Sequence, residues 1–147
     1  MTVQIEACAR RVQSDDLIVK DIAGELMLYN KAKNKAFCLN KTASFVWQHA
    51  DGNTSVPEIA ELLAQEMNLP VDVQVVELAI QSLEQDGLLE PAEDERTYSS
   101  GVTRRDLIRK YGVRAALALP VVTMLTVATR KAHASGWTSD GDPHRPR

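Results

Sequence analysis

The sequence predicts an α+β fold: a winged helix-turn-helix in which a three-stranded antiparallel sheet precedes three helices, with a C-terminal tail that has room for one helix. Three short apolar runs separated by turn residues come first. The apolar residues then recur at the helical period of 3.6 over three further segments. Three strands followed by three short helices is an α+β arrangement, and a helical trio beside a small sheet favours a winged helix-turn-helix.

The strands are predicted from apolar runs and the turns between them. Leu17–Lys20 and Glu25–Tyr29 flank Ala23-Gly24, where glycine supplies the positive φ that a tight hairpin needs. Asn30–Asn34 is a polar turn, and Lys35–Leu39 follows as the third run. The partial alternation of apolar residues indicates strands with one packed face and one wetter face.

Capping residues mark the first two helices. Asn40 or Thr42 can cap the first helix, which is expected to end at Asp51-Gly52. Ser55 precedes Glu58 by three residues, a capping-box spacing that starts the second helix. The second helix is expected to end at Leu69-Pro70.

The third predicted helix, from about Val71 to Gln85, has an unusually wide apolar arc. Its core stripe consists of Val76, Ala79, Ile80 and Leu83. An adjacent flank consists of Val71, Val75, Leu78 and Ser82. Two interpretations fit this arc: the helix is buried on more than one side, or the flank lines a groove for a partner.

An ordered set of short motifs resembles the PqqD-like peptide chaperones, the recognition elements of ribosomally made, post-translationally modified peptides. The set comprises Leu26–Tyr29 (LMLY), Phe37–Asn40 (FCLN), Thr42-Ala43, Val46-Trp47, Asp51-Gly52, Ile59 and Gly87–Leu89 (GLL). The resemblance covers about residues 12–91. It implies a non-catalytic adaptor that binds a leader peptide and presents it to a modifying enzyme.

The resemblance also implies where the peptide binds. Family members take up the leader as an added strand against the third strand, in the cleft beside the third helix, where unpaired N–H and C=O groups of a sheet edge are available. By position, the edge would come from Lys35, Ala36, Phe37, Cys38 and Leu39, and the helical wall from Val71, Val75, Leu78 and Ser82. Phe37 and Leu39 also qualify as core residues, which would still leave the backbone of the strand available for pairing.

Catalysis, metals and cofactors are not expected. His49, His133 and His144 lie far apart in the sequence. The sequence contains no glycine-rich phosphate loop, no Cys/His cluster at metal spacing and no nucleophile next to a plausible base. We therefore expect neither an enzyme nor a cofactor-binding protein.

Charge divides the chain into two parts. Residues 1–95 have a net charge of −10, and residues 96–147 a net charge of +7. The acidic part argues against nucleic acid as a partner, because phosphate binding relies on Lys and Arg. A DNA-binding winged-helix regulator is the alternative from another class, and the third helix, with Asp72, Glu77, Glu84 and no basic residue, disfavours it.

The chain is expected to consist of a peptide-binding domain at residues 12–91, a polar linker at 92–102, a basic and apolar segment at 103–134 and a disordered peptide at 135–147. The N-terminal residues have no apolar h-region, so we expect no N-terminal signal peptide and a cytoplasmic domain. Cys8 lies in a segment expected to be frayed and Cys38 in a strand, and we expect no disulfide between them.

The tail contains a motif similar to twin-arginine export signals. Thr103, Arg104 and Arg105 are followed by the apolar pair Leu107 and Ile108. The uncharged run Ala115–Thr129 and the A-x-A sequence at 132–134 come next, as in an export signal. As a helix that run would span roughly 22 Å, against about 30 Å of membrane hydrocarbon.

Three interpretations of the tail remain open. It is an amphipathic helix that binds a partner, with a disordered end; or a membrane or export element that would tether the chain as a scaffold; or a fused precursor, with Ser135–Arg147 as the modified peptide. Trp137, Thr138 and Ser139 supply modifiable groups in that last segment. The sequence leaves the oligomeric state open as well, because an unpaired sheet edge can pair with a second copy.

Overall fold

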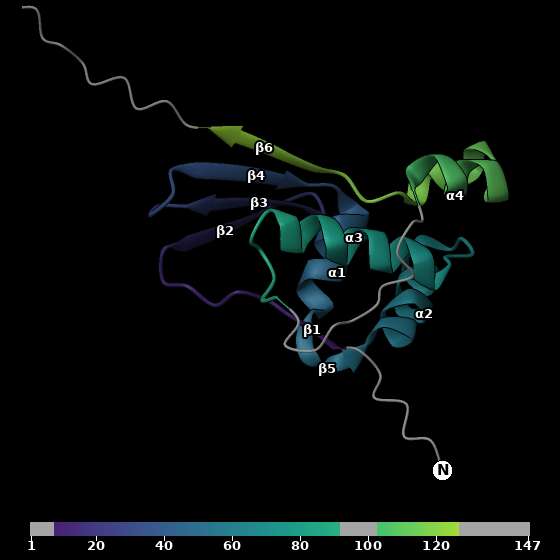
Figure 1. Cartoon of the computed structure of the whole chain (residues 1–147), viewed down its shortest axis with the longest axis horizontal. Helices are drawn as coiled ribbons and strands as arrows, with labels where there is room; N and C mark the ends of the chain where they lie inside the picture. The colour runs from purple at the N-terminus through teal and green to yellow at the C-terminus, as the bar shows by residue number, and fades with distance from the viewer. Residues whose placement is uncertain (1–7, 92–102, 127–147) are drawn as a thin grey trace, which may run out of the picture.

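The computed structural model describes residues 8–91 and 103–126 and confirms the predicted α+β class (Figure 1). The strands are β1 (Cys8–Arg10), β2 (Leu17–Ile22), β3 (Glu25–Asn30), β4 (Lys35–Leu39), β5 (Asp51–Ser55) and β6 (Val122–Thr126). The α-helices are α1 (Lys41–His49), α2 (Val56–Met67), α3 (Val73–Gln85) and α4 (Arg104–Tyr111), and a 3-10 helix, η1, spans Val113–Ala118.

The β2–β3 hairpin forms where the sequence predicts it. Ala23 and Gly24 both have positive φ, 57° and 85°, as the tight turn requires. The Asp21 carboxylate accepts a hydrogen bond from the Gly24 backbone N–H at 3.1 Å. At the next turn the Tyr29 hydroxyl donates to the side-chain oxygen of Asn34 at 2.8 Å. Local chemistry therefore closes both turns of the sheet.

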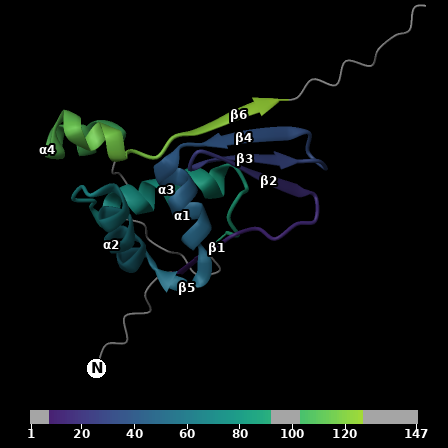
Figure 2. The same cartoon turned by 180° about the vertical axis from the view of Figure 1, so that it is seen from behind.

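The prediction of a three-stranded sheet is wrong, because the tail supplies a fourth strand. The strand order is β2-β3-β4-β6, and β6 pairs antiparallel with β4. Both views place β6 along the edge of the sheet that is farthest from β2 (Figures 1 and 2). The pairing joins residues more than eighty positions apart, such as Lys35 and Thr126, and no local pattern in the sequence predicts it.

The tail also differs from the expectation of a helix in its apolar run. The α-helix of the tail covers the basic motif, and the run beginning at Ala115 continues from η1 into β6. A 15-residue apolar run suits a helix by length alone, whereas the β-branched residues of Val121–Thr126 favour a strand once an edge is available. The interpretation of the domain as a winged helix remains a prediction.

A small second sheet was not predicted. It pairs β1 with β5, so Cys8 lies in a strand rather than in a frayed end. The first helix ends at His49, two residues earlier than expected, because Asp51 begins β5. The Asp51 carboxylate accepts hydrogen bonds from the backbone N–H groups of Asn53 and Thr54, both at 2.8 Å, and so shapes this turn.

Side-chain caps fix where the helices start. Asn40, one of the two predicted caps, accepts from the Ala43 backbone N–H at 3.0 Å at the start of α1. Ser55 caps α2, as predicted. Helix α3 begins at Val73 rather than Val71, because the Asp72 side chain accepts from the backbone N–H of Gln74 and caps the helix.

The main core lies between the inner face of the sheet and helices α1, α2 and α3. Leu26 and Leu28 of β3 and Phe37 and Leu39 of β4 are all at most 3% exposed. The helices contribute fully buried side chains, among them Val46, Ile59, Val76, Ile80 and Leu83. Within residues 8–91 and 103–126, no helix is both long and apolar enough to cross a membrane.

This arrangement predicts that substitutions on the two faces of the sheet differ sharply in their effect on the free energy of unfolding. Leu28 is fully buried, so Leu28→Ala should lower the free energy of unfolding by about 2–5 kcal/mol. Ile18 on β2 is 46% exposed, and Ile18→Ala should cost at most about 1 kcal/mol. Chemical denaturation of both variants measures the difference, and equal losses would contradict the assignment of the inner face.

Candidate functional site

The candidate site is the edge of β4 together with the adjoining flank of α3. Strand β4 pairs along its whole length, from Lys35 opposite Thr126 to Leu39 opposite Val122. Phe37 and Leu39 point into the core, whereas the side chains of Ala36 and Cys38 are partly exposed on the outer face. The inward pair are thus core residues, and the edge of β4 pairs with β6 through its backbone.

Asn40 joins this edge to the segment that leads into β6. Its side-chain amide donates to the Leu119 carbonyl at 2.9 Å, and its side-chain oxygen accepts from the Val121 backbone N–H at 3.0 Å. The Asn40 backbone N–H also donates to the Val121 carbonyl at 3.1 Å. These bonds bracket Pro120, which is fully buried and has no N–H of its own.

The flank of α3 forms an apolar wall against the tail. Val75 on α3 clusters with Leu107 of α4 and with Leu119, and all three are at most 6% exposed. Val71 and Leu78 pack against this cluster as partly buried neighbours. The structure therefore brings three of the four wall residues expected from the sequence into contact with one segment of the tail.

Ser82, the fourth expected wall residue, makes a hydrogen bond within its own helix. Its hydroxyl donates to the Leu78 carbonyl at 2.9 Å, one turn earlier in α3. A serine that bonds back to its own helix keeps its polar group satisfied beside apolar neighbours.

The twin-arginine-like motif forms helix α4. Thr103 is its N-cap, and Thr103 and Asp106 form a reciprocal capping box. Leu107 is 1% exposed against α3, whereas Ile108 is 39% exposed. The side chains of Arg104 and Arg105 are exposed. The motif residues are thus used for a capped amphipathic helix, and their role as an export or membrane signal remains a prediction.

A polar contact holds the end of α4 to the start of α3. The Tyr111 hydroxyl donates to the Asp72 carboxylate, and the Lys110 ammonium lies 3.9 Å from the same carboxylate. The bond from Tyr111 lowers the pKa of Asp72 below its ordinary value, and the Gln74 backbone N–H and Lys110 act in the same direction. Burial raises the pKa of Glu77 on the same helix.

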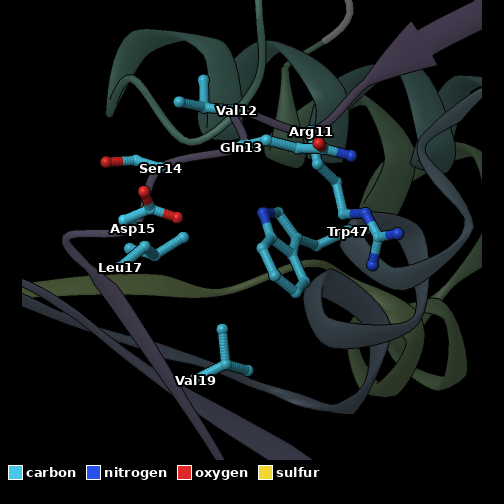
Figure 3. Close-up of a pocket in the computed structure, with 8 residues that line it drawn as sticks. All are labelled: Arg11, Val12, Gln13, Ser14, Asp15, Leu17, Val19 and Trp47. Atoms are coloured by element: carbon cyan, nitrogen blue, oxygen red, sulfur yellow. The ribbon is translucent and has the colours of Figure 1, made fainter.

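A separate hollow lies around Trp47, away from the β4 edge (Figure 3). Its walls are Arg11, Val12, Gln13, Ser14, Asp15, Leu17, Val19 and Trp47. The Trp47 indole N–H donates to the Leu88 carbonyl at 3.3 Å, and the Arg11 guanidinium lies 5.2 Å from the centroid of the indole ring. These contacts make Trp47 a structural link between α1 and the chain after α3.

Sequence reasoning missed the side of the site that the tail supplies. The sequence predicts Asn40 as a helix cap and as part of a family-like motif, but its contacts with the tail depend on Leu119 and Val121, which are distant in the sequence. Leu119 and Pro120 belong to a run whose uncharged composition gave no sign of edge pairing. The apolar flank of α3 and the family resemblance indicate that a peptide covers this side, but neither indicates that the peptide is the tail of the same chain.

A strand added to a sheet edge beside an apolar helix is the geometry of peptide recognition by strand addition. Residues 25–89 match the family model of coenzyme PQQ synthesis protein D (PqqD), and this match supports a PqqD-like domain over that part of the chain. Neither the curated proteins nor the solved structures gave a match to the chain. The match ends before α4 and β6, so the docked tail lies outside the family domain.

The family gives the domain a general role. PqqD-like proteins are non-catalytic accessory proteins in the biosynthesis of ribosomally made, post-translationally modified peptides. They bind a precursor peptide and a modifying enzyme. Among residues 8–91 and 103–126, no group of His, Cys, Asp or Glu side chains could hold a metal ion.

The double role of Asn40 predicts a selective effect of Asn40→Asp. The carboxylate can still cap α1 and accept from Val121, but an oxygen replaces the N–H that donates to Leu119. We expect docking of the tail to weaken by roughly 1–3 kcal/mol, because one hydrogen bond is lost at a partly buried site. Hydrogen exchange at Val122–Thr126 should accelerate while α1 stays protected, and equal exchange in both proteins would contradict this role.

The lowered pKa of Asp72 predicts acid release of α4. A carboxyl group with a lowered pKa in the docked state stabilises docking at pH values above its ordinary pKa, about 3.8. That stabilisation is lost as the pH falls through the lowered pKa. NMR shifts of Val75 and Leu119, which contact Leu107 and lie away from the Asp106 capping box, should therefore move towards undocked values below about pH 4. Tyr111→Phe should flatten this dependence, and unchanged shifts down to pH 3 in the wild-type protein would contradict it.

Proposed function

We propose that this protein is a non-catalytic peptide chaperone. It holds a leader peptide as an added strand on β4, beside α3, and presents the remainder of the precursor to a modifying enzyme. The observation that supports this proposal is the complete antiparallel pairing of β4 with a strand from outside the family domain.

The division of labour at the site suits leader recognition. Backbone pairing along β4 supplies affinity for any extended segment, and side-chain pockets beside the edge supply specificity. Here the pocket is the apolar wall of Val71, Val75 and Leu78, which accepts a leucine side chain. The Asn40 side-chain amide adds hydrogen bonds to backbone groups on both sides of one ligand residue.

A chaperone of this kind acts without chemistry of its own. Binding the leader and the enzyme together raises the effective concentration of the substrate at the catalytic centre, to the millimolar range for short flexible connections. We propose a cytoplasmic location for this step. The burial of Leu107 against α3 supports a tail that binds a protein surface in preference to a membrane.

The hydrogen-bond pattern of the β4–β6 pair shows how to open the groove selectively. Asn40 and Val121 form a hydrogen-bonded pair, so by alternation Cys38 and Thr123 form the next one. The N–H of Met124 then points away from β4. Thr123→Pro should therefore remove a bond of the ladder, whereas Met124→Pro should leave the ladder intact.

Two matched double variants test the proposal. Leu107→Asp with Thr123→Pro should release both contacts of the tail, and Ile108→Asp with Met124→Pro is the control, because Ile108 and Met124 are 39% and 46% exposed. The released variant should bind leader peptides of precursors encoded beside the gene, or a synthetic peptide of residues 103–126, at least tenfold more tightly than the control does. NMR shifts should concentrate in Lys35–Leu39 and Val71–Ser82.

The outcome against the proposal is equally defined. A released variant that still unfolds cooperatively and binds none of these peptides would show that the β4 edge is not a peptide receptor. Peptide binding with shifts confined to the hollow around Trp47 would also overturn the assigned groove.

A further inference from the structure

We propose that the ligand of this groove is built into the chain: residues 103–126 act as a covalently attached leader, and residues 127–147 are the substrate presented to the enzyme. This inference rests on the proposed function of the groove. It identifies the peptide that the groove holds as a segment of the same molecule.

The tail is held at two separate places, as a dedicated ligand would be. Helix α4 inserts Leu107 against Val75, and its last turn contacts the Asp72 carboxylate through Tyr111 and Lys110. Strand β6 pairs with β4 in an unbroken register of five residues. An accidental edge contact would satisfy backbone groups alone, whereas this segment buries specific side chains as well.

The segment that connects α4 to β6 is itself bound by the domain. Ala118, Leu119 and Pro120 are each at most 6% exposed, and Pro120 is among the fully buried residues. Pro120 lacks an N–H, so the extended chain here needs a partner only for the neighbouring groups. Asn40 supplies it, because its amide binds the Leu119 carbonyl and the Val121 N–H. Both bonds are made to backbone groups on either side of Pro120, so they suit an extended segment in which the residue between them needs no N–H of its own.

Covalent attachment favours this ligand over a free one. Residues 92–102 join the family domain to Thr103, so the segment is covalently attached to the domain that carries its groove. Covalent attachment through a short connection gives effective concentrations up to the millimolar range. In direct competition for the groove, a free leader of the same intrinsic affinity at micromolar concentration would be bound roughly a thousand times less often than the attached segment.

The direction of β6 suits presentation of the last part of the chain to an enzyme. β6 ends at Thr126, opposite Lys35 at the start of β4, and its arrowhead points away from α4 (Figures 1 and 2). The chain that continues from there includes Trp137, Thr138 and Ser139, which have modifiable side chains. An enzyme docked near the β3–β4 turn would lie beside the end of β6 while that strand stays bound.

The test is co-expression of the full chain with each peptide-modifying enzyme encoded beside the gene, followed by intact-mass measurement and fragment mapping. The wild-type chain and the Ile108→Asp/Met124→Pro control should both acquire a mass shift that maps within residues 127–147. In the released variant, Leu107→Asp/Thr123→Pro, the modified fraction should fall at least about tenfold, because the leader is no longer held.

Two outcomes would overturn the inference, and each is distinguishable from failure of the proposed function. A tail that remains unmodified with every such enzyme excludes a built-in substrate. Modification of a separate precursor that becomes faster in the released variant would make the tail an autoinhibitory plug, displaced by a leader from another chain. In either case, peptide binding by the released variant would still support the peptide-chaperone function.

Discussion

The edge of β4 is the constraint on which the rest of this structure depends. Its inner side chains, Phe37 and Leu39, are buried in the core. Core packing therefore fixes the position of the strand and of its outer edge. Its outward backbone groups need partners, and an uncovered edge would pair with any available strand. The tail satisfies this need through β6 and turns an exposed edge into the middle of a four-stranded sheet.

Asn40 has two roles, because it caps a core helix and also holds the tail. The same side-chain oxygen accepts from Ala43, at the start of α1, and from Val121, just before β6. The cap orients the amide before any ligand arrives, which lowers the entropic cost of recognition. A residue placed by the domain core thereby selects the conformation of the tail around Pro120.

Charge and apolar contact cooperate in holding the tail. The acidic first part of the chain and the basic second part attract each other at long range, and Lys110 beside Asp72 is one local instance. Such exposed pairs contribute little individually. The cluster of Val75, Leu107 and Leu119 supplies the larger part of the affinity, since it removes three apolar side chains from water.

The sequence by itself determined the hairpin turns, the helix caps, the three core helices and the apolar flank of α3, because each depends on residues close together in the chain. It also indicated the family through short motifs. Only the tertiary structure decided what covers the β4 edge, that β1 pairs with β5, and that the apolar run of the tail becomes a strand. Strand pairing is set by partners distant in sequence, and a short apolar run suits a helix or a strand until an edge is available.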